Sequence, residues 1–325
     1  MGKKSPKITR AGFKAIKNVL KLELHKPNHN MKFRHLTYFS LSVLGAFGLA
    51  SCGSSSSDKD KNSKEFEQAD SLGSHIEELS YIIPPPSQIP YLLQLSGAEF
   101  NESLVNSRTK ADQYASRTDK AALNLGVYAA DIGYLSSYDK VQEAIDYLQS
   151  AKTLADGLGV IGTFDVEVLK QFEANISNKD SLTHLLDRTI KRTQSFLTDD
   201  NRNKLSAMVI TGSFVEGLYI ATGVVKSYPK DLPTDAKNTI LTPLVRIVLE
   251  QKKSVTEVNK MLASISDQPE SVAGLVADSK ALEAEYAALN IEEQIRNNKA
   301  NLVLSDKNLV EITNIVERLR KKITE

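Results

Sequence analysis

The sequence predicts an all-α fold, a multi-helix bundle or helical-repeat-like array in a single large domain over residues 65–325. Three observations support this prediction. Apolar residues in this region recur at intervals of three and four, and strand-like alternation is nearly absent. The chain of 325 residues is 41% apolar, which is enough to fill a sizeable core. No linker rich in Pro, Gly or Ser divides the region after Tyr91.

The predicted helices follow this periodicity and end at residues that terminate helices. Gly157-Leu158-Gly159 ends one helix and Pro229 ends another. Pro84-Pro85-Pro86 and Pro90 predict an extended segment between the first helix and Tyr91. We expect helices at 65–80, 108–117, 119–136, 138–157, 165–175, 180–197, 201–228, 235–251, 254–264, 269–297 and 306–323.

The last two predicted helices are expected to form an antiparallel hairpin. Each has an apolar seam at a spacing of three and four. The seams could pack on each other or form a coiled-coil face for a partner. Both are short for an independent coiled coil, which favours packing within the chain. The seam residues are Val272, Leu275, Ser279, Leu282, Tyr286 and Leu289, then Leu309, Ile312, Val316, Leu319 and Ile323.

The helix at 119–136 is expected to be buried on all sides, because both of its faces are poor in charge. Its small residues Gly126, Ala130, Gly133 and Ser137 share a face, which predicts close approach by another helix. The opposite face carries polar residues. A buried polar group without a partner costs roughly 1–3 kcal/mol, so these residues must find partners or a ligand.

The helix at 201–228 is similar, being apolar around most of its circumference and rich in Gly. Together the two helices predict a polar pocket between them. The alternative is a structural network in which Tyr hydroxyls and amides satisfy two buried acids, and buried polar groups more often have that role. The candidate residues are Asn124, Tyr128, Asp131, Tyr134, Glu216 and Tyr219.

The segment Met31–Cys52 has the organisation of a secretory signal. Lys32 and Arg34 precede an uncharged, mostly apolar run over 36–50. This run is shorter than the roughly 20 residues that a transmembrane helix needs. Leu49-Ala50-Ser51-Cys52 resembles the lipobox of bacterial lipoproteins, and Cys52 is the chain's single Cys. The resemblance implies cleavage before Cys52, lipidation of Cys52, and a membrane anchor.

Three further predictions follow for the N-terminal region. Residues 1–30 are expected to be a wrongly assigned start upstream of Met31, with a nucleic-acid-binding arm as the alternative. Residues 52–64 are expected to be a flexible, polar tether. Removal of 1–51, with its ten basic residues and one acidic residue, leaves 31 basic and 39 acidic residues, a net charge of −8. This balance argues against a nucleic-acid partner.

Most of the region after Cys52 resembles an uncharacterised family of all-helical envelope lipoproteins of Bacteroidetes-type bacteria. The residues that carry this resemblance are Lys120 to Asp131, Gly212 to Ala221, the Pro-rich segment before Tyr91, and Asn106. The resemblance implies an all-helical domain held at the cell envelope. The outer membrane is the expected location, on either its periplasmic or its surface face. It implies no activity.

The catalytic motifs that can be read from sequence are missing. There is no phosphate-binding loop, dinucleotide fingerprint, His-Glu-x-x-His or Gly-x-Ser-x-Gly. His75 and His184 are interpreted as surface or boundary residues, and no cofactor or metal is expected. The leading hypothesis is a non-enzymatic, lipid-anchored protein that binds a partner or a small ligand. A structural scaffold is one alternative. The other is a carboxylate-dependent envelope hydrolase, which requires Asp131 and Glu216 roughly 5–9 Å apart in an open cleft.

Overall fold

The computed structural model places the folded residues in one compact unit, Glu67–Glu325. The structure describes Leu72, Ile76, Leu79, and residues 82–160, 166–175, 178–199, 202–228, 233–265, 268, 270–289, 297 and 307–325. The predicted extension 1–30, signal segment 31–51, Cys52 and tether 52–64 lie outside the described residues, so those predictions remain predictions.

The fold is all-α, as predicted, and the described residues contain no strand. The helices that we expected from residue 108 onward are present, and most of their ends are shifted by three residues or fewer. The predicted helix 269–297 is the exception, because α12 ends at Ala288. Gly159, two residues after the end of α6, lies in the left-handed region, with φ 69°, which favours glycine. The α-helices are α3 Gln88–Leu95, α4 Ala111–Ala115, α5 Thr118–Ser137, α6 Val141–Gly157, α7 Val166–Ala174, α8 Lys179–Asp199, α9 Asn203–Ser227, α10 Thr234–Leu249, α11 Lys252–Ala263, α12 Glu270–Ala288 and α15 Lys307–Thr324.

Helices α5 and α9 form the centre of the fold and pack against each other. Every residue of α5 from Ala121 to Ser137 is buried, which confirms the predicted burial on all sides. Among the described residues, α9 is the helix long and apolar enough to cross a membrane. Because 89% of its most apolar window is buried by protein, α9 has the surroundings of a core helix.

Glycines set the close approach of the two central helices. A Cβ on Gly126 would clash with the backbone of Val209 and lie 2.6 Å from the Ser213 nitrogen. A Cβ on Gly212 would clash with the backbone of Leu123. The predicted strip of small residues therefore does admit another helix. Its other glycine, Gly133, instead faces the segment before α3, where a Cβ would lie 2.8 Å from the Ser87 Cα.

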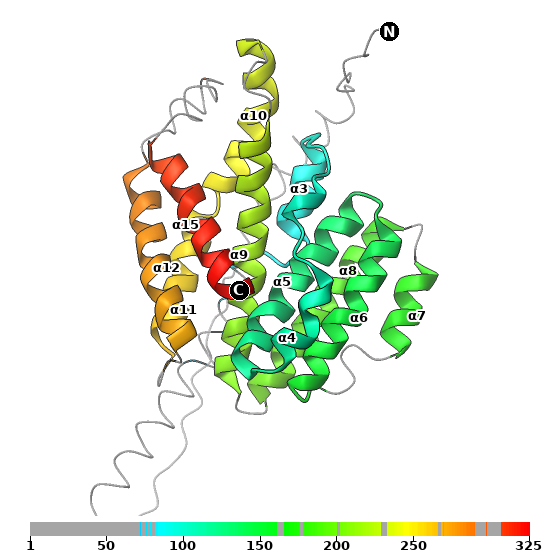
Figure 1. The fold of residues 1–325 in the computed structure, drawn as a ribbon. Helices are drawn as coiled ribbons and strands as arrows, with labels where there is room; N and C mark the ends of the chain where they lie inside the picture. Colours follow the sequence, from blue (N-terminus) through cyan, green and yellow to red (C-terminus); the bar gives the residue numbers. More distant parts are fainter. Residues whose placement is uncertain are drawn as a thin grey trace, which may run out of the picture. The chain divides into compact units, whose positions relative to one another are not determined.

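The other helices cover this central pair from two sides (Figure 1). Helices α6 and α8 pack against α5, and α7 packs against α6 and α8. Helices α10, α11 and α15 pack against α9, and α12 covers α11 and α15. Helix α3 contacts both α5 and α9. The core is therefore built around α5 and α9, two helices that have few solvent-facing residues.

Helices α12 and α15 form the predicted antiparallel hairpin. The start of α12 lies beside the end of α15, since Lys322 Nζ is 2.7 Å from Asp278 Oδ2 and 3.0 Å from the Gly274 carbonyl oxygen. The seam residues that lie on α12 and α15 are buried, and the remaining seam residue, Leu289, follows the end of α12 and is half-buried. The seams are therefore packed within the chain, as favoured, and do not form a free partner face.

The expectation of an extended segment up to Tyr91 was wrong. Helix α3 begins at Gln88 and includes Pro90 as its third residue. Amide groups in the first turn of a helix have no partner within the helix, so a proline there removes no hydrogen bond. The Tyr91 nitrogen makes the first such bond, 3.0 Å to the Ser87 carbonyl oxygen.

Candidate functional site

The six predicted site residues lie on α5 and α9, but the structure brings only some of them together. Asp131 and Glu216 meet between the two helices, and both are fully buried. Tyr219 lies beside them across the side chain of Arg320. Asn124, Tyr128 and Tyr134 have their hydrogen-bond partners elsewhere.

Arg320 of α15 completes the acid pair. Its Nε lies 3.2 Å from Glu216 Oε2, and its Nη2 lies 3.5 Å from Oε1. The guanidinium also stacks on Tyr219, with Cζ 4.6 Å from the ring centroid. The Arg320 side chain is only 18% exposed. Two acids and a single cation therefore share a site that is closed to solvent on the carboxylate side.

The charge balance of this site requires a proton on one acid. Burial and the neighbouring Glu216 carboxylate raise the pKa of Asp131 well above its ordinary value. Burial also raises the pKa of Glu216, but Arg320 opposes that shift. Among the described residues, Asp131 Oδ1 accepts no hydrogen bond. We therefore assign the proton to Asp131, whose carboxyl then donates to Glu216, leaving an ionised Glu216 to pair with Arg320.

Two tyrosines hold the chain segment next to Asp131, and a third packs against one of them. The Asn106 amide nitrogen donates to Asp131 Oδ2 at 3.3 Å, and the Tyr147 hydroxyl donates to the Asn106 carbonyl oxygen at 2.6 Å. The Tyr128 hydroxyl donates to the Ser107 carbonyl oxygen at 3.0 Å. Tyr114 stacks against Tyr128 with ring centroids 6.1 Å apart. Tyr128 thus holds a backbone segment in place.

Asn124 and Tyr134 have structural partners at opposite ends of α5. Asn124 Nδ2 donates to the Ile323 carbonyl oxygen at 3.0 Å, in the last turn of α15. The Tyr134 hydroxyl accepts from the Asn101 amide nitrogen at 2.9 Å, and its ring packs on Phe100 at 5.1 Å between centroids. The predicted polar pocket of six residues is therefore divided into separate contacts along the helix.

This arrangement favours the structural network over the polar pocket. A hydrolytic acid pair needs access for water and substrate, but neither Asp131 nor Glu216 has exposed surface. Within the described ranges, no three His, Cys, Asp or Glu side chains come together in a way that could hold a metal ion.

An open cavity lies instead between α8, α9 and the Pro-rich segment before α3. Its volume is about 300 Å³, at the small end of the range for ligand sites. Helix α8 forms one wall, Ile210 and Ser213 of α9 form another, and the Pro-rich segment before α3 forms the third. The residues of α8 that line it are His184, Asp187, Arg188, Ile190, Lys191 and Gln194.

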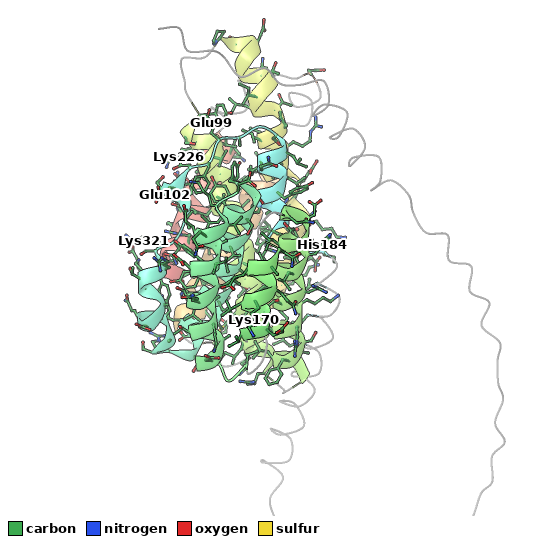
Figure 2. All side chains as sticks on the ribbon, turned by 90° about the vertical axis from the view of Figure 1, so that its right-hand side faces the viewer. Glu99, Glu102, Lys170, His184, Lys226 and Lys321 are labelled. Carbon is green, nitrogen blue, oxygen red and sulfur yellow. The ribbon has the colours of Figure 1, made fainter. Side chains whose placement is uncertain are left out.

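Asp187 links two walls of this cavity. The buried Ser87 donates its hydroxyl to the carboxylate, with Oγ 2.8 Å from Oδ1 and 2.7 Å from Oδ2. Burial raises the pKa of Asp187, and the Ser87 hydrogen bonds oppose that shift. His184 lies one turn earlier and is exposed, as predicted, and Figure 2 shows it at the surface of the molecule. The cavity therefore has a polar wall with a fixed carboxylate.

Sequence reasoning missed Arg320 and the cavity on α8. Arg320 follows the seam residue Val316 by four positions, so it extends the buried face of α15. A basic residue at that position could have suggested a buried acid as its partner. The sequence carries no such signal for the cavity, because the three walls of the cavity come from separate parts of the chain.

Comparisons with protein-family models, with curated proteins and with solved structures gave no match. The resemblance to helical envelope lipoproteins therefore stays a prediction from the residues that carry it.

Proposed function

We propose that this chain is a lipid-anchored protein of the cell envelope that binds a small ligand in the cavity on α8 and is not an enzyme. The anchor is supported by the sequence. A basic start, an uncharged apolar run and the single Cys follow one another in Met31–Cys52. A lipidated N-terminal Cys with two or more acyl chains would hold the chain stably at a bilayer.

The observation that carries the binding role is the contrast between the two polar sites. The acid pair Asp131 and Glu216 is fully buried, and Glu216 is paired with Arg320, so the pair is closed to a ligand from solvent. The cavity on α8 is open, with exposed His184 and Arg188 at its rim and apolar side chains behind them. An apolar pocket with a few polar groups at its edge is the usual form of a small-molecule site.

Native mass spectrometry of the membrane-extracted protein tests this role. We expect a bound small molecule that Gln194→Trp displaces, because the half-buried Gln194 lines the cavity and an indole there would fill it. Ser195→Trp is the matched control, because Ser195 is the next residue of α8, is exposed, and does not line the cavity. A protein without bound ligand, or equal loss of the ligand in both variants, would contradict the proposal.

A further inference from the structure

The rim of the cavity on α8 is basic. His184, Arg188 and Lys191 follow one another at intervals of four and three residues, so they lie on one face of the helix. All three are exposed at the cavity. Among the described lining residues, two basic side chains, Arg188 and Lys191, lie beside one acidic side chain, Asp187. The rim therefore favours an anionic group over a cationic one.

The carboxylate of Asp187 does not reverse this preference. Both of its oxygens accept from the Ser87 hydroxyl, and the side chain is largely buried at the junction of α8 with the segment before α3. Arg188, in contrast, is exposed and forms no ion pair with the described residues. A guanidinium at the mouth of a pocket can bind a carboxylate or phosphate through two parallel hydrogen bonds.

The deeper walls of the cavity are apolar. Leu79 and Ile83 line it from one side and Ile210 of α9 from the other, and all three are buried. Ile190 contributes from α8, and Pro84, Pro85 and Pro86 complete the lining. Prolines are rigid and present no amide donors, so this wall can contact an aliphatic chain without leaving buried donors unpaired.

We propose that the ligand is a single-chain anionic amphiphile, whose aliphatic chain packs between Ile83 and Ile210 and whose anionic head binds Arg188 at the rim. This inference rests on the proposed function, because it names the chemical class of the ligand for the same cavity. A fatty acid has this chemistry, with one apolar chain and one carboxylate.

Calorimetric titration of the full chain in phosphatidylcholine nanodiscs tests the inference. The probes are decanoate, decanol and decyltrimethylammonium, which share one chain and differ in the charge of the head, each below its micelle-forming concentration. Empty nanodiscs supply the background from partition into lipid. We expect decanoate to bind more tightly than the other two probes, by about tenfold, as a charge-assisted pair at a partly desolvated site would produce.

Charge reversal at the rim gives the specific readout. Arg188→Glu should weaken the binding of decanoate by at least about tenfold and strengthen the binding of decyltrimethylammonium. A purely structural role for Arg188 would not produce this inversion. Arg192→Glu is the matched control, because Arg192 is an exposed arginine one turn further along α8 that does not line the cavity. It should leave both affinities unchanged.

Several outcomes would overturn the inference. These are equal or tighter binding of decanol or decyltrimethylammonium, equal effects of Arg188→Glu and Arg192→Glu, or no binding of any probe. The proposed function is tested separately, by the displacement of the native ligand in Gln194→Trp. A native ligand that Gln194→Trp displaces, together with indifference to Arg188→Glu, would leave a binding protein whose ligand is not an anion.

Discussion

The Glu216 carboxylate on α9 accepts a hydrogen bond from Arg320 of α15, with Nε 3.2 Å from Oε2. The Glu216 side chain has no exposed surface. Asp131 of α5 joins this pair with a carboxyl whose pKa burial and Glu216 raise well above its ordinary value. Three helices that are far apart in the sequence thus share one charge-balanced contact. This contact is one of several that hold α15 on the central helices.

Removal of the cation should destabilise the fold strongly. Arg320→Met leaves Glu216 ionised and unpaired in the core, and breaking a buried pair in this way costs about 3–5 kcal/mol. Arg318→Met is the matched control, because Arg318 lies on the same helix with a side chain 48% exposed and pairs with Asp278 and Glu311. Its exposed pairs are worth about 1 kcal/mol or less. Urea denaturation measures the free energy of unfolding of both variants, and a similar loss of stability in the two would contradict the account.

The acid pair also predicts a pH dependence of stability. The folded pKa of Asp131 lies above the unfolded value near 3.8, so the folded state keeps a proton that the unfolded chain releases. The free energy of unfolding should therefore fall as pH rises above the unfolded value, by up to about 1.4 kcal/mol per pH unit until the folded pKa is reached.

Asp131→Asn removes this titration while keeping a donor toward Glu216, so it isolates the effect of Asp131. Relative to the wild type, the variant should become progressively more stable as pH rises above the unfolded pKa, until the folded pKa of Asp131 is reached. Urea denaturation across that range gives the difference at each pH. A difference that stays constant with pH would show that Asp131 does not carry the buried proton.

The close contact of α5 with α9 at Gly126 should not tolerate a methyl group. Gly126→Ala puts a Cβ into the backbone of Val209 and 2.6 Å from the Ser213 nitrogen, where no flexible side chain can yield. We expect a loss of about 3 kcal/mol or more in thermal or chemical denaturation, since overpacking against backbone is at the costly end of its range.

Gly157→Ala is the control for this substitution. Gly157 ends α6, and an added Cβ there would be 3.9 Å from the nearest atoms, which is ordinary van der Waals contact. The alanine should leave stability unchanged or raise it by about 0.5–1 kcal/mol. If Gly126→Ala behaved in the same way, the close crossing of α5 and α9 would be wrong.

Removal of the Tyr114 hydroxyl group should destabilise the last turn of α15. The Tyr114 hydroxyl donates to the Thr324 carbonyl oxygen at 2.9 Å, and its ring is buried. Tyr114→Phe should cost about 1 kcal/mol and speed amide hydrogen exchange at the end of α15. Tyr91→Phe, at a tyrosine that is 36% exposed, should change neither quantity. Unchanged exchange in Tyr114→Phe would rule out this contact as a fastening for α15.

The helices and their burial could be predicted from sequence, because both depend on local spacing. The seams of α12 and α15 and the uniform burial of α5 follow from intervals of three and four. The start of α3 could not be predicted from composition alone. Pro90 breaks a helix in its interior and is accepted in its first turn, and the position of that turn depends on the packing of Gln88–Leu95 against α5 and α9.

The candidate site was harder to predict than the fold, because its partners are distant in sequence. Asp131 and Glu216 were correctly expected to be buried acids between two helices, but the pattern gave no reason to choose Arg320, 104 residues after Glu216, as their cation. Tyr134 was grouped with them because it shares the helix, and its position along α5 places it beside Phe100 instead. Spacing predicts which face a residue occupies and does not predict which element covers that face.

The proposal that this chain works at a membrane depends on Cys52, and mass spectrometry of the N-terminal peptide from membrane-purified protein tests it most directly. We expect a peptide that begins at Cys52 and carries the added mass of a diacylglycerol group, with or without a further acyl chain. A peptide in which Cys52 is an unmodified thiol still joined to Ser51 would contradict the account.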